Sequence, residues 1–218
     1  MVGYNPYAHN FTTSTVQVTS PYLSLLVPGG QHSSPYISAQ IETTVTNILY
    51  ASVRTTALFS SVAGTCHGLF FYKNDNQEID IEYLTNRSAI SNSFSSLPNQ
   101  GGASTWTNKQ KSRLPLHYTL QATTPGTLES TAFGVGAVNP ANEEHEYRID
   151  WTAGKVQFFL DGELQQTFTG NNVPTMPGSW LWNNWSNGDP GWSSGPPIQD
   201  NVLRIRSIEM YYNTTSSC

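Results

Sequence analysis

The sequence predicts an all-β protein built as a β-sandwich of the jelly-roll type. Short stretches of alternating apolar and polar residues recur along the chain, and turn-forming residues separate them. No stretch has a convincing helical period, and no internal repeat is visible. The 17 Gly and 13 Pro residues suit the many turns of such a fold. At 218 residues the chain fits one domain, residues 1–218, with a substantial core.

The first half of the chain contains a series of strand candidates. Residues 1–20 are polar and aromatic without a clear period, so we expect them to wrap the edge of the domain. Residues 22–27 are an apolar run closed by a Pro-Gly-Gly turn. β-Branched residues are frequent in 41–57, which predicts one or two strands. Residues 66–72 form a compact apolar strand, and the turn at 73–77 follows it.

The second half continues the pattern after a long segment rich in Ser, Asn and Gly, 85–104, which predicts a loop. Residues 106–108 and 117–121 are strand candidates separated by a basic turn that contains Pro. The clearest alternation lies in 145–168, where Asp-Gly in the middle supplies the residues of a tight hairpin. Residues 202–212 are expected to form the last strand.

One strand candidate, residues 77–84 with the sequence QEIDIEYL, carries three acids at every second position. Side chains on a strand alternate between its two faces, so Glu78, Asp80 and Glu82 share one face. Ile79 and Ile81 fill the other. No Lys or Arg in the stretch neutralises the acids, and like charges on neighbouring same-face positions cost stability. A strand that accepts this cost is expected to use the carboxyl groups.

Two uses fit three stacked carboxyl groups: metal binding, and acid/base work on a sugar. Glycoside hydrolysis with retention needs two carboxyl groups about 5–5.5 Å apart, one as nucleophile and one as acid and then base. Long Glu side chains on a concave face lean towards each other, and Asp80 between them can share a proton and separate their pKa values. The alternative is an acidic solvent-facing side of an edge strand.

A second segment, 173–192, has a composition typical of sugar binding. Four of the six Trp lie here among Gly, Pro and Asn residues. Aromatic rings stack on the C–H faces of pyranose rings, and Asn side chains hydrogen-bond to sugar hydroxyls. For Trp180 and Trp182, a place in the core is as well supported as a place in the cleft.

QEIDIEYL resembles the active-site strand of glycoside hydrolase family 16, and its unbulged spacing is similar to that of the lichenase-type branch. HEYRIDWTAGKVQFFLDG also resembles a segment of that family. The resemblance implies a concanavalin A-like jelly roll with a substrate cleft on the concave face of a curved sheet. It also implies that Glu78 is the nucleophile, that Asp80 assists it, and that Glu82 is the acid/base.

The resemblance extends to substrate-binding positions. The family's second cleft strand has a Pro-Gly followed by Asn-x-Trp and a further Trp, which implies that Asn183, Trp185 and Trp192 face the cleft. Trp106 and Asn108 stand where lichenase-like members have a cleft Tyr and Asn. One departure is Asn-Gln directly before the first Glu, where many members have an aromatic or acidic residue, and it leaves the subfamily open.

The function that the resemblance implies is a retaining endo-glycosidase acting on β-1,3- and β-1,3-1,4-glucans by double displacement. A cell-wall transglycosylase with the same acids is one alternative, because a sugar hydroxyl can replace water as the acceptor. A lectin-like module that binds glycans without cleaving them is another, although three stacked carboxyl groups have no role in it.

Composition points to a secreted or cell-wall protein. Charged residues make up only 11%, against a globular average of about 25%. The net charge of −5 and the absence of a basic cluster exclude nucleic acid as a partner, and no apolar run is long enough to cross a bilayer. Sequons at Asn10, Asn86 and Asn213 are expected glycosylation sites, whereas the one at Asn184 is expected to be bare. We interpret Met1 as an added start residue after removal of a leader.

Two cysteines and five histidines complete the inventory of reactive groups. Cys66 and Cys218 are expected to pair, with two free buried thiols as the alternative. No His spacing suits a zinc site, so we expect no metal or cofactor. A structural calcium occurs in some relatives of the family, but no ligand cluster here indicates one. His145 is expected to form hydrogen bonds in the core or near the acids rather than to act as the base. The protein is expected to be a monomer.

Overall fold

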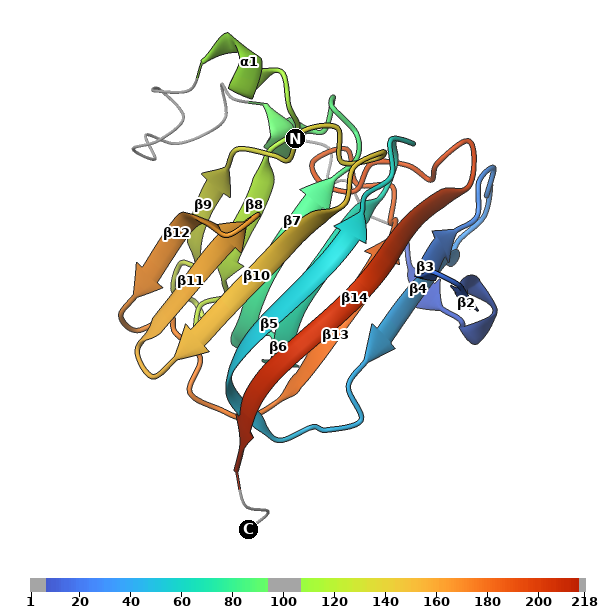
Figure 1. The fold of residues 1–218 in the computed structure, drawn as a ribbon. Coiled ribbons are helices and arrows are strands. Elements are labelled where there is room, and N and C mark those ends of the chain that lie inside the picture. The colour runs from blue at the N-terminus through green and yellow to red at the C-terminus, as the bar shows by residue number, and fades with distance from the viewer. Residues whose placement is uncertain (1–6, 94–106, 216–218) are drawn as a thin grey trace.

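In a computed structural model, residues 7–93 and 107–215 are described, and they form two seven-stranded sheets packed face to face (Figure 1). The strands are β1 His9–Phe11, β2 Val16–Thr19, β3 Tyr22–Val27, β4 Tyr36–Glu42, β5 Ile48–Leu58, β6 Cys66–Asn74, β7 Gln77–Leu84, β8 Leu116–Leu120, β9 Ser130–Gly134, β10 His145–Thr152, β11 Lys155–Leu160, β12 Glu163–Thr169, β13 Ser179–Trp185 and β14 Asn201–Thr214. The helical segments are η1 Thr13–Thr15, η2 Ile90–Asn92 and α1 Asn108–Lys111. The all-β sandwich predicted from the sequence is confirmed.

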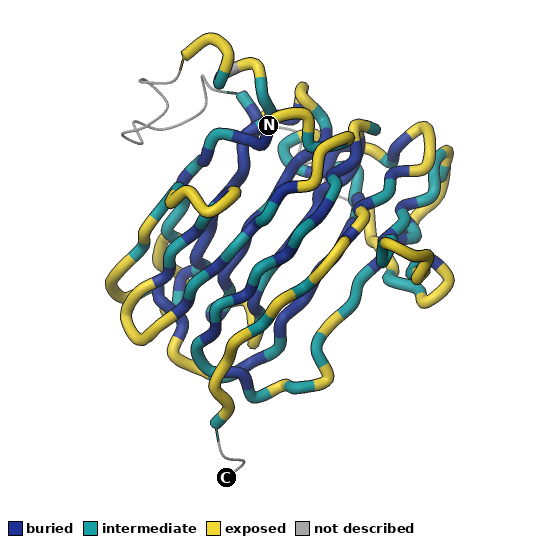
Figure 2. Tube along the Cα trace, in the orientation of Figure 1, coloured by how far each residue is buried: buried dark blue, intermediate teal, exposed yellow. Residues whose placement is uncertain are grey.

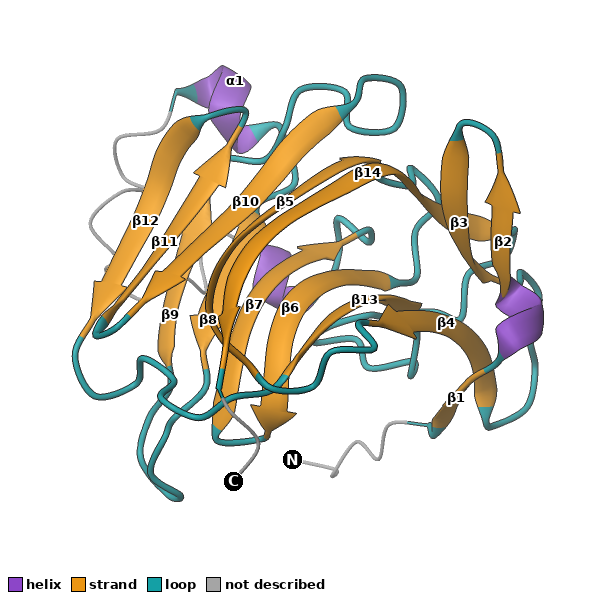
Figure 3. Cartoon of the chain, turned by 60° about the horizontal axis from the view of Figure 1, so that its bottom comes forward, coloured by secondary structure: helices purple, strands orange, loops and turns teal. Residues whose placement is uncertain are grey.

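Each sheet has a distinct strand order. The cleft sheet runs β1-β4-β13-β6-β7-β8-β9, and the outer sheet runs β12-β11-β10-β5-β14-β3-β2. Neighbouring strands pair antiparallel except β1 and β4, which pair parallel. Figure 3 shows β5 and β14 of the outer sheet arching over β6, β7 and β13 of the cleft sheet. The acidic strand β7 therefore lies inside its sheet, between β6 and β8, and not at an edge.

The core lies between the two sheets and follows from the alternation of apolar residues. Buried and intermediate positions alternate along the central strands, while the turns and most of the second half of β14 are exposed (Figure 2). Ile79 and Ile81 of β7 pack against the core with 0% and 1% exposure, as the alternation predicts. Trp182 of the cleft sheet donates its indole N–H to the hydroxyl of Thr55 in the outer sheet at 2.8 Å, which joins the two layers.

Most predicted strands are present, and the differences have local causes. Residues 41–57 divide into the end of β4 and most of β5, separated by 43–47. The strand β9 and the short edge strands β1 and β2 were not predicted, because brief polar segments carry little alternation. The predicted hairpin is confirmed: Asp161 and Gly162 have φ of 51° and 81°, the left-handed values that a tight turn between β11 and β12 requires.

The strand predicted at 106–108 is wrong at Asn108, which begins α1. Thr107 caps this short helix: its side chain accepts the backbone N–H of Gln110, and the Gln110 side chain accepts the backbone N–H of Thr107. This reciprocal capping box favours a helical turn over an extended segment. Trp106 lies outside the described residues.

Candidate active site

The three acids of β7 line one face of the cleft sheet because of the strand register. Glu82 lies opposite Gly68 of β6 and His117 of β8. Asp80, two residues earlier, lies opposite Phe70 and Thr119 in the same way. Side chains in one cross-strand row share a face, so the acids, the aromatic residues of β6 and the polar residues of β8 form one surface.

A cavity of about 460 Å³ opens on this surface. Its volume is in the range of ligand pockets, and carboxyl, amide and aromatic side chains line it together. From β7 and β13 come Glu78, Asp80, Glu82, Leu181, Asn183 and Trp185. From β1, β4, β6 and the turn after β6 come His9, Phe11, Gln40, Gly68, Phe70, Tyr72 and Asp75. We call this space the first cavity.

Gly68 keeps the first cavity open. A Cβ atom at this position would lie 2.5 Å from Oδ1 of Asn183, which is too close for any real contact. Asn183 sits on the neighbouring strand, directly opposite Gly68. Its Oδ1 atom is buried and has no hydrogen-bond partner among the described residues, so it is available to accept a hydroxyl from a ligand.

A second cavity of about 440 Å³ adjoins the first at Glu82. Trp192, His117, Thr119 and Gln121 line it, together with Glu82. Further lining residues are Ile90, Ser91, Glu129, Thr131, Ala132 and Phe133. Of the three acids of β7, Glu82 alone borders both cavities, whereas Glu78 and Asp80 border the first.

Burial dominates the electrostatics of Glu78 and Asp80. Burial is the largest of the causes that raise the pKa of Glu78 to about 7. A hydrogen bond with Asp80 lowers this pKa, and repulsion from nearby carboxylates raises it further. Burial also raises the pKa of Asp80 well above its usual value, and repulsion from Glu78 and Glu82 contributes. Asp80 is only 5% exposed. Three adjacent carboxyl groups with raised pKa values titrate as a coupled set, and their mutual repulsion disfavours the state in which all three are ionised.

Glu82 is held by two donors. Its Oε1 atom accepts the indole N–H of Trp192 at 3.0 Å and the thiol of Cys66 at 3.1 Å. Burial raises the pKa of Glu82, and these two hydrogen bonds oppose the rise because they stabilise the ionised form. Trp192, which was predicted to stack on substrate, therefore contacts the third acid of β7 directly.

Cys66 is a free, buried thiol in the structure. The expected disulfide with Cys218 is thus not found at Cys66, because the thiol faces Glu82 and packs in a small apolar cluster with Leu84 and Ala89. Cys218 lies outside the described residues.

The remaining predicted residues separate into those at the cleft and those away from it. Trp185 borders the first cavity, with its ring 5.2 Å from that of His9. Asn108 is exposed on α1 and is not among the residues that line either cavity. Trp180 and Trp182 are 1% and 2% exposed, so both fill the core.

Asn184 is fully buried, and its amide donates to the backbone of Leu25 and to Asn201. A glycan on that amide has no room in the folded chain. The other sequon residues are accessible: Asn10 and Asn213 are exposed and Asn86 is partly exposed.

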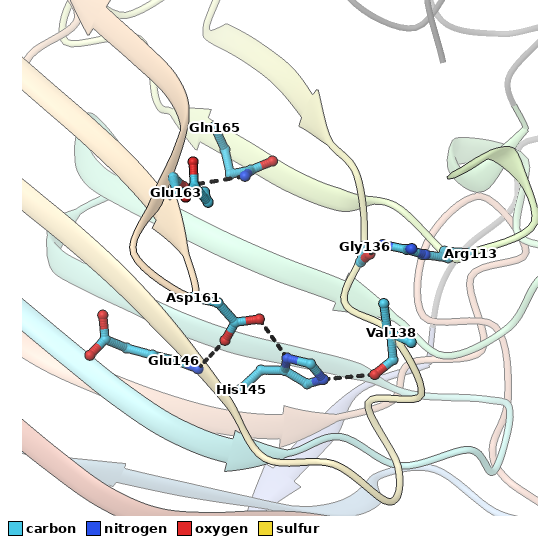
Figure 4. Close-up of polar contacts among 8 residues, drawn as sticks. All are labelled: Arg113, Gly136, Val138, His145, Glu146, Asp161, Glu163 and Gln165. Atoms are coloured by element: carbon cyan, nitrogen blue, oxygen red, sulfur yellow. Dashed lines mark hydrogen bonds and ion pairs between the residues drawn. The ribbon is translucent and has the colours of Figure 1, made fainter. Parts of the chain in front are cut away.

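His145 lies on β10 of the outer sheet and makes no contact with the acids of β7 in the described structure. Its two ring nitrogens face Oδ2 of Asp161 and the carbonyl of Val138, both at 2.7 Å (Figure 4). Asp161 also accepts the backbone N–H of Glu146. This histidine therefore fixes the hairpin of β11 and β12 to the start of β10.

Sequence reasoning missed several cleft residues. His9 and Phe11 come from the short strand β1, and Gly68, Phe70 and Tyr72 come from β6. The alternation rule assigns Gly68, Phe70 and Tyr72 to one face of β6, but only the register with β7 reveals that this face is the one bearing the acids. Among the described residues there is no group of three or more His, Cys, Asp or Glu side chains arranged to hold a metal ion.

A sandwich whose cleft combines three carboxyl groups with Trp, Tyr and Asn side chains is typical of enzymes that act on glycosidic bonds. The comparison with known families agrees, since residues 4–196 match Glycosyl hydrolases family 16. The chain belongs to this family.

Curated relatives match over short segments. A β-glucanase of Bacillus subtilis (strain 168) is 39% identical over 46 residues, which is 21% of this chain and 19% of that protein. A Crh-like protein of Arthroderma benhamiae is 32% identical over 87 residues, 33% of this chain and 19% of that protein. The matched segments thus span less than a fifth of the length of these relatives.

Solved structures match along nearly the whole fold. The Bacillus licheniformis β-glucanase superposes with a TM-score of 0.67 at 18% identity, over 97% of this chain and 88% of that one. The catalytic domain of a Thermotoga petrophila endo-1,3-β-glucanase (laminarinase) gives 0.70 at 17% identity, over 96% and 84%. The Crh5 transglycosylase in complex with NAG gives 0.64 at 17% identity, over 94% and 79%. At these identities the likeness concerns the fold. No helix within residues 7–93 and 107–215 is long and apolar enough to cross a membrane.

Proposed function

We propose that this chain cleaves β-1,3- and mixed β-1,3-1,4-glucans internally, with retention of configuration at the anomeric carbon. The observation that carries the proposal is the row of three acids on the cleft face of β7, with Asp80 buried between two partly exposed Glu side chains and Glu82 bordering both cavities. The cleft extends to either side of Glu82, which suits a polymer chain bound across the site rather than a single sugar.

The proposed reaction has two displacements. In the first, the carboxylate of Glu78 attacks the anomeric carbon, the glycosidic C–O bond breaks, and Glu82 gives its proton to the departing oxygen. In the second, Glu82 takes a proton from water, the water oxygen bonds to the anomeric carbon, and Glu78 is released. The raised pKa of Glu82 suits a group that must be protonated at the start.

The surroundings of Glu78 and Asp80 support the choice of nucleophile between these two acids, although burial raises the pKa of Glu78 to about 7. Glu78 is partly exposed and hydrogen-bonded to Asp80, so a single negative charge in the cluster is better accommodated on Glu78 than on the buried Asp80. Because the acid must stand beside the leaving group, the glycone belongs in the first cavity and the leaving group in the second.

A transglycosylase is the second candidate, and the second cavity favours it. Trp192, Gln121 and Thr119 offer a ring face and hydrogen-bonding groups beside Glu82, which an acceptor sugar could use in place of water. A lectin-like module fits less well, because three adjacent carboxyl groups on one strand face cost stability that a site without chemistry has no reason to accept. We also propose that the protein acts outside the cell or at the cell wall, where polymeric glucans and N-glycans on Asn10, Asn86 and Asn213 occur.

The test is product analysis on a panel of β-glucans, with and without an oligosaccharide acceptor. We expect new reducing ends of β configuration, and longer products with acceptor would favour the transglycosylase. Glu78→Ala should lose activity on glucan, and azide should rescue it on an activated β-glucoside to give the α-glycosyl azide. An α product from the wild-type enzyme, or rescue of Glu82→Ala to the inverted azide, would contradict the assignment of roles.

A further inference from the structure

The two hydrogen bonds to the Glu82 carboxyl converge on one oxygen. Oε1 accepts from Cys66 in the cleft sheet and from Trp192 in the segment after β13. An oxygen that accepts two hydrogen bonds is poorly placed to carry a proton itself, because both of its lone-pair directions are engaged. Among the described residues, Oε2 has no such pair of donors.

The sequence sets Cys66 beneath Glu82. Cys66 begins β6 and shares the cleft face with Gly68, which lies opposite Glu82. Its side chain is fully buried, and Leu84 and Ala89 pack with it. The partly buried rings of Trp185 and Trp192 complete this cluster.

The thiol remains a donor across the working pH range. Burial is the largest cause that raises the pKa of Cys66 well above its ordinary value, and the neighbouring charge of Glu82 adds to it. The sulfur therefore keeps its hydrogen, which can only be directed at an acceptor. In the described structure the thiol donates to Oε1 of Glu82, at 3.1 Å.

We propose that Cys66 and Trp192 are positioning residues for Glu82, holding Oε1 as an acceptor so that Oε2 carries the proton given to the leaving group. The inference rests on the proposed role of Glu82 as the acid/base. Once Glu82 has given up its proton, both donors face a carboxylate, and hydrogen bonds to a charged acceptor are stronger than those to a neutral one. The two contacts thus stabilise the product of proton transfer more than the starting acid.

Three substitutions test the contacts. Cys66→Val removes the thiol and suits a buried strand position, Cys66→Ser keeps a donor, and Trp192→Phe keeps a ring without the N–H. Val53→Ala is the matched control, because Val53 is a buried core residue of the outer sheet, 2% exposed, and does not line the cleft.

Alkylation of the unfolded, non-reduced chain should first show that Cys66 is free. A Cys66–Cys218 disulfide would overturn the inference.

We expect Cys66→Val and Trp192→Phe each to lower kcat on glucan by about threefold to tenfold, the effect of one ordinary hydrogen bond. In Cys66→Val, KM should change by less than about twofold, since Cys66 lines neither cavity and substrate binding is not the step affected. The first step on an activated aryl β-glycoside, followed as a burst of leaving group, should be nearly unchanged because it needs no proton. The basic limb of kcat/KM should move to higher pH, because the ionised form of Glu82 has lost a donor.

Cys66→Ser should stay close to wild type, and Val53→Ala should lower stability without moving the pH profile. Equal losses on glucan and on the aryl glycoside, or a basic limb that does not move in Cys66→Val, would reject the positioning role. A second measurement is independent of turnover: the 13C NMR titration of the Glu82 carboxyl, assigned by its loss in Glu82→Gln. If the wild type cleaves no glucan, the proposed function fails, whereas an unchanged Glu82 titration in Cys66→Val rejects this inference alone.

Discussion

At the scale of single residues, Asp80 differs from its neighbours in being almost completely buried and in contacting Glu78. Its pKa lies well above the usual range because of burial and the repulsion of Glu78 and Glu82. Both effects favour the protonated form of Asp80, and a protonated carboxyl group can donate a hydrogen bond to an ionised Glu78. Its role in the proposed reaction is to supply a donor rather than a charge.

This role separates two substitutions. Asp80→Asn keeps an N–H donor, so kcat/KM should still fall as pH drops through the Glu78 pKa of about 7. Asp80→Ala removes the donor that lowers this pKa, so the acid limb should move to higher pH. The pH profiles of kcat/KM for both variants check this. Identical profiles for Asn and Ala would show that the hydrogen bond has no influence on Glu78.

Trp185 is the tryptophan that borders the first cavity. If a glucose ring stacks on it, Trp185→Ala should raise KM about fivefold, corresponding to roughly 1 kcal/mol for one aromatic face. Trp185→Phe keeps part of the face and should have a smaller effect. KM on oligosaccharides and the melting temperature should be measured together. A Trp185→Ala variant with a lower melting temperature and an unchanged KM would assign Trp185 to packing.

The sequence located the acids themselves because a strand period of two is a local property, visible within eight residues. The partners of those acids depend on contacts between distant segments. Trp192 lies 110 residues after Glu82 in the chain, and its hydrogen bond to Oε1 has no local signature. Trp192 was therefore predicted as a cleft residue without its hydrogen bond to Glu82, and Cys66 was predicted to pair with Cys218 rather than to face Glu82.

At the scale of elements, β7 combines a core face that stabilises the fold with an acidic face that opposes it. Ile79 and Ile81 are buried against the outer sheet, whereas Glu78 has a pKa raised from 4.5 to about 7. A carboxyl group whose folded pKa is raised binds more protons in the folded state, so stability falls as pH rises between these two values.

We expect the free energy of unfolding to decline from about pH 4.5 to about pH 7 and to recover in part in Glu78→Gln, which cannot ionise. Since Glu78 is partly exposed, the difference between the variants at pH 8 should be smaller than about 3 kcal/mol. Urea denaturation at pH 4.5, 6 and 8 measures it. A Glu78→Gln variant less stable than the wild type at pH 8 would contradict this account.

Strands with long alternation were predicted well, whereas short ones were not. The pattern in β10 and β11 and the Asp-Gly turn after them are local, and the structure has all three. The short strand β1 joins the cleft sheet through parallel pairing with β4, which depends on the assembled sheet and not on its own three residues. His9 and Phe11 reach the first cavity by this route.

At the scale of the whole molecule, the cleft depends on two sheets held in a fixed relation. The fold class followed from turn frequency and alternation, but the strand order did not, since β13 lies next to β4 and β6 although long segments of chain separate them. Side-chain hydrogen bonds between the two sheets help to fix how the sheets pack. The hydrogen bond from Trp182 to Thr55 is one of them, and both side chains are 2% exposed.

Thr55→Val keeps the shape of the side chain but leaves the indole N–H of Trp182 buried without a partner. The cost should be about 1–3 kcal/mol, which lowers the melting temperature by about 2–4 °C for each kcal/mol in a chain of this size. Thr55→Ser keeps the hydroxyl and should lose less. Because Trp182 faces the core and not the cleft, KM and kcat on glucan should stay near wild type below the transition. Calorimetry and kinetics on the same preparations check this. A Thr55→Val variant with an unchanged melting temperature would show that the hydrogen bond between the sheets does not stabilise the fold. A lowered kcat in fully folded Thr55→Val would show that this hydrogen bond also affects the cleft.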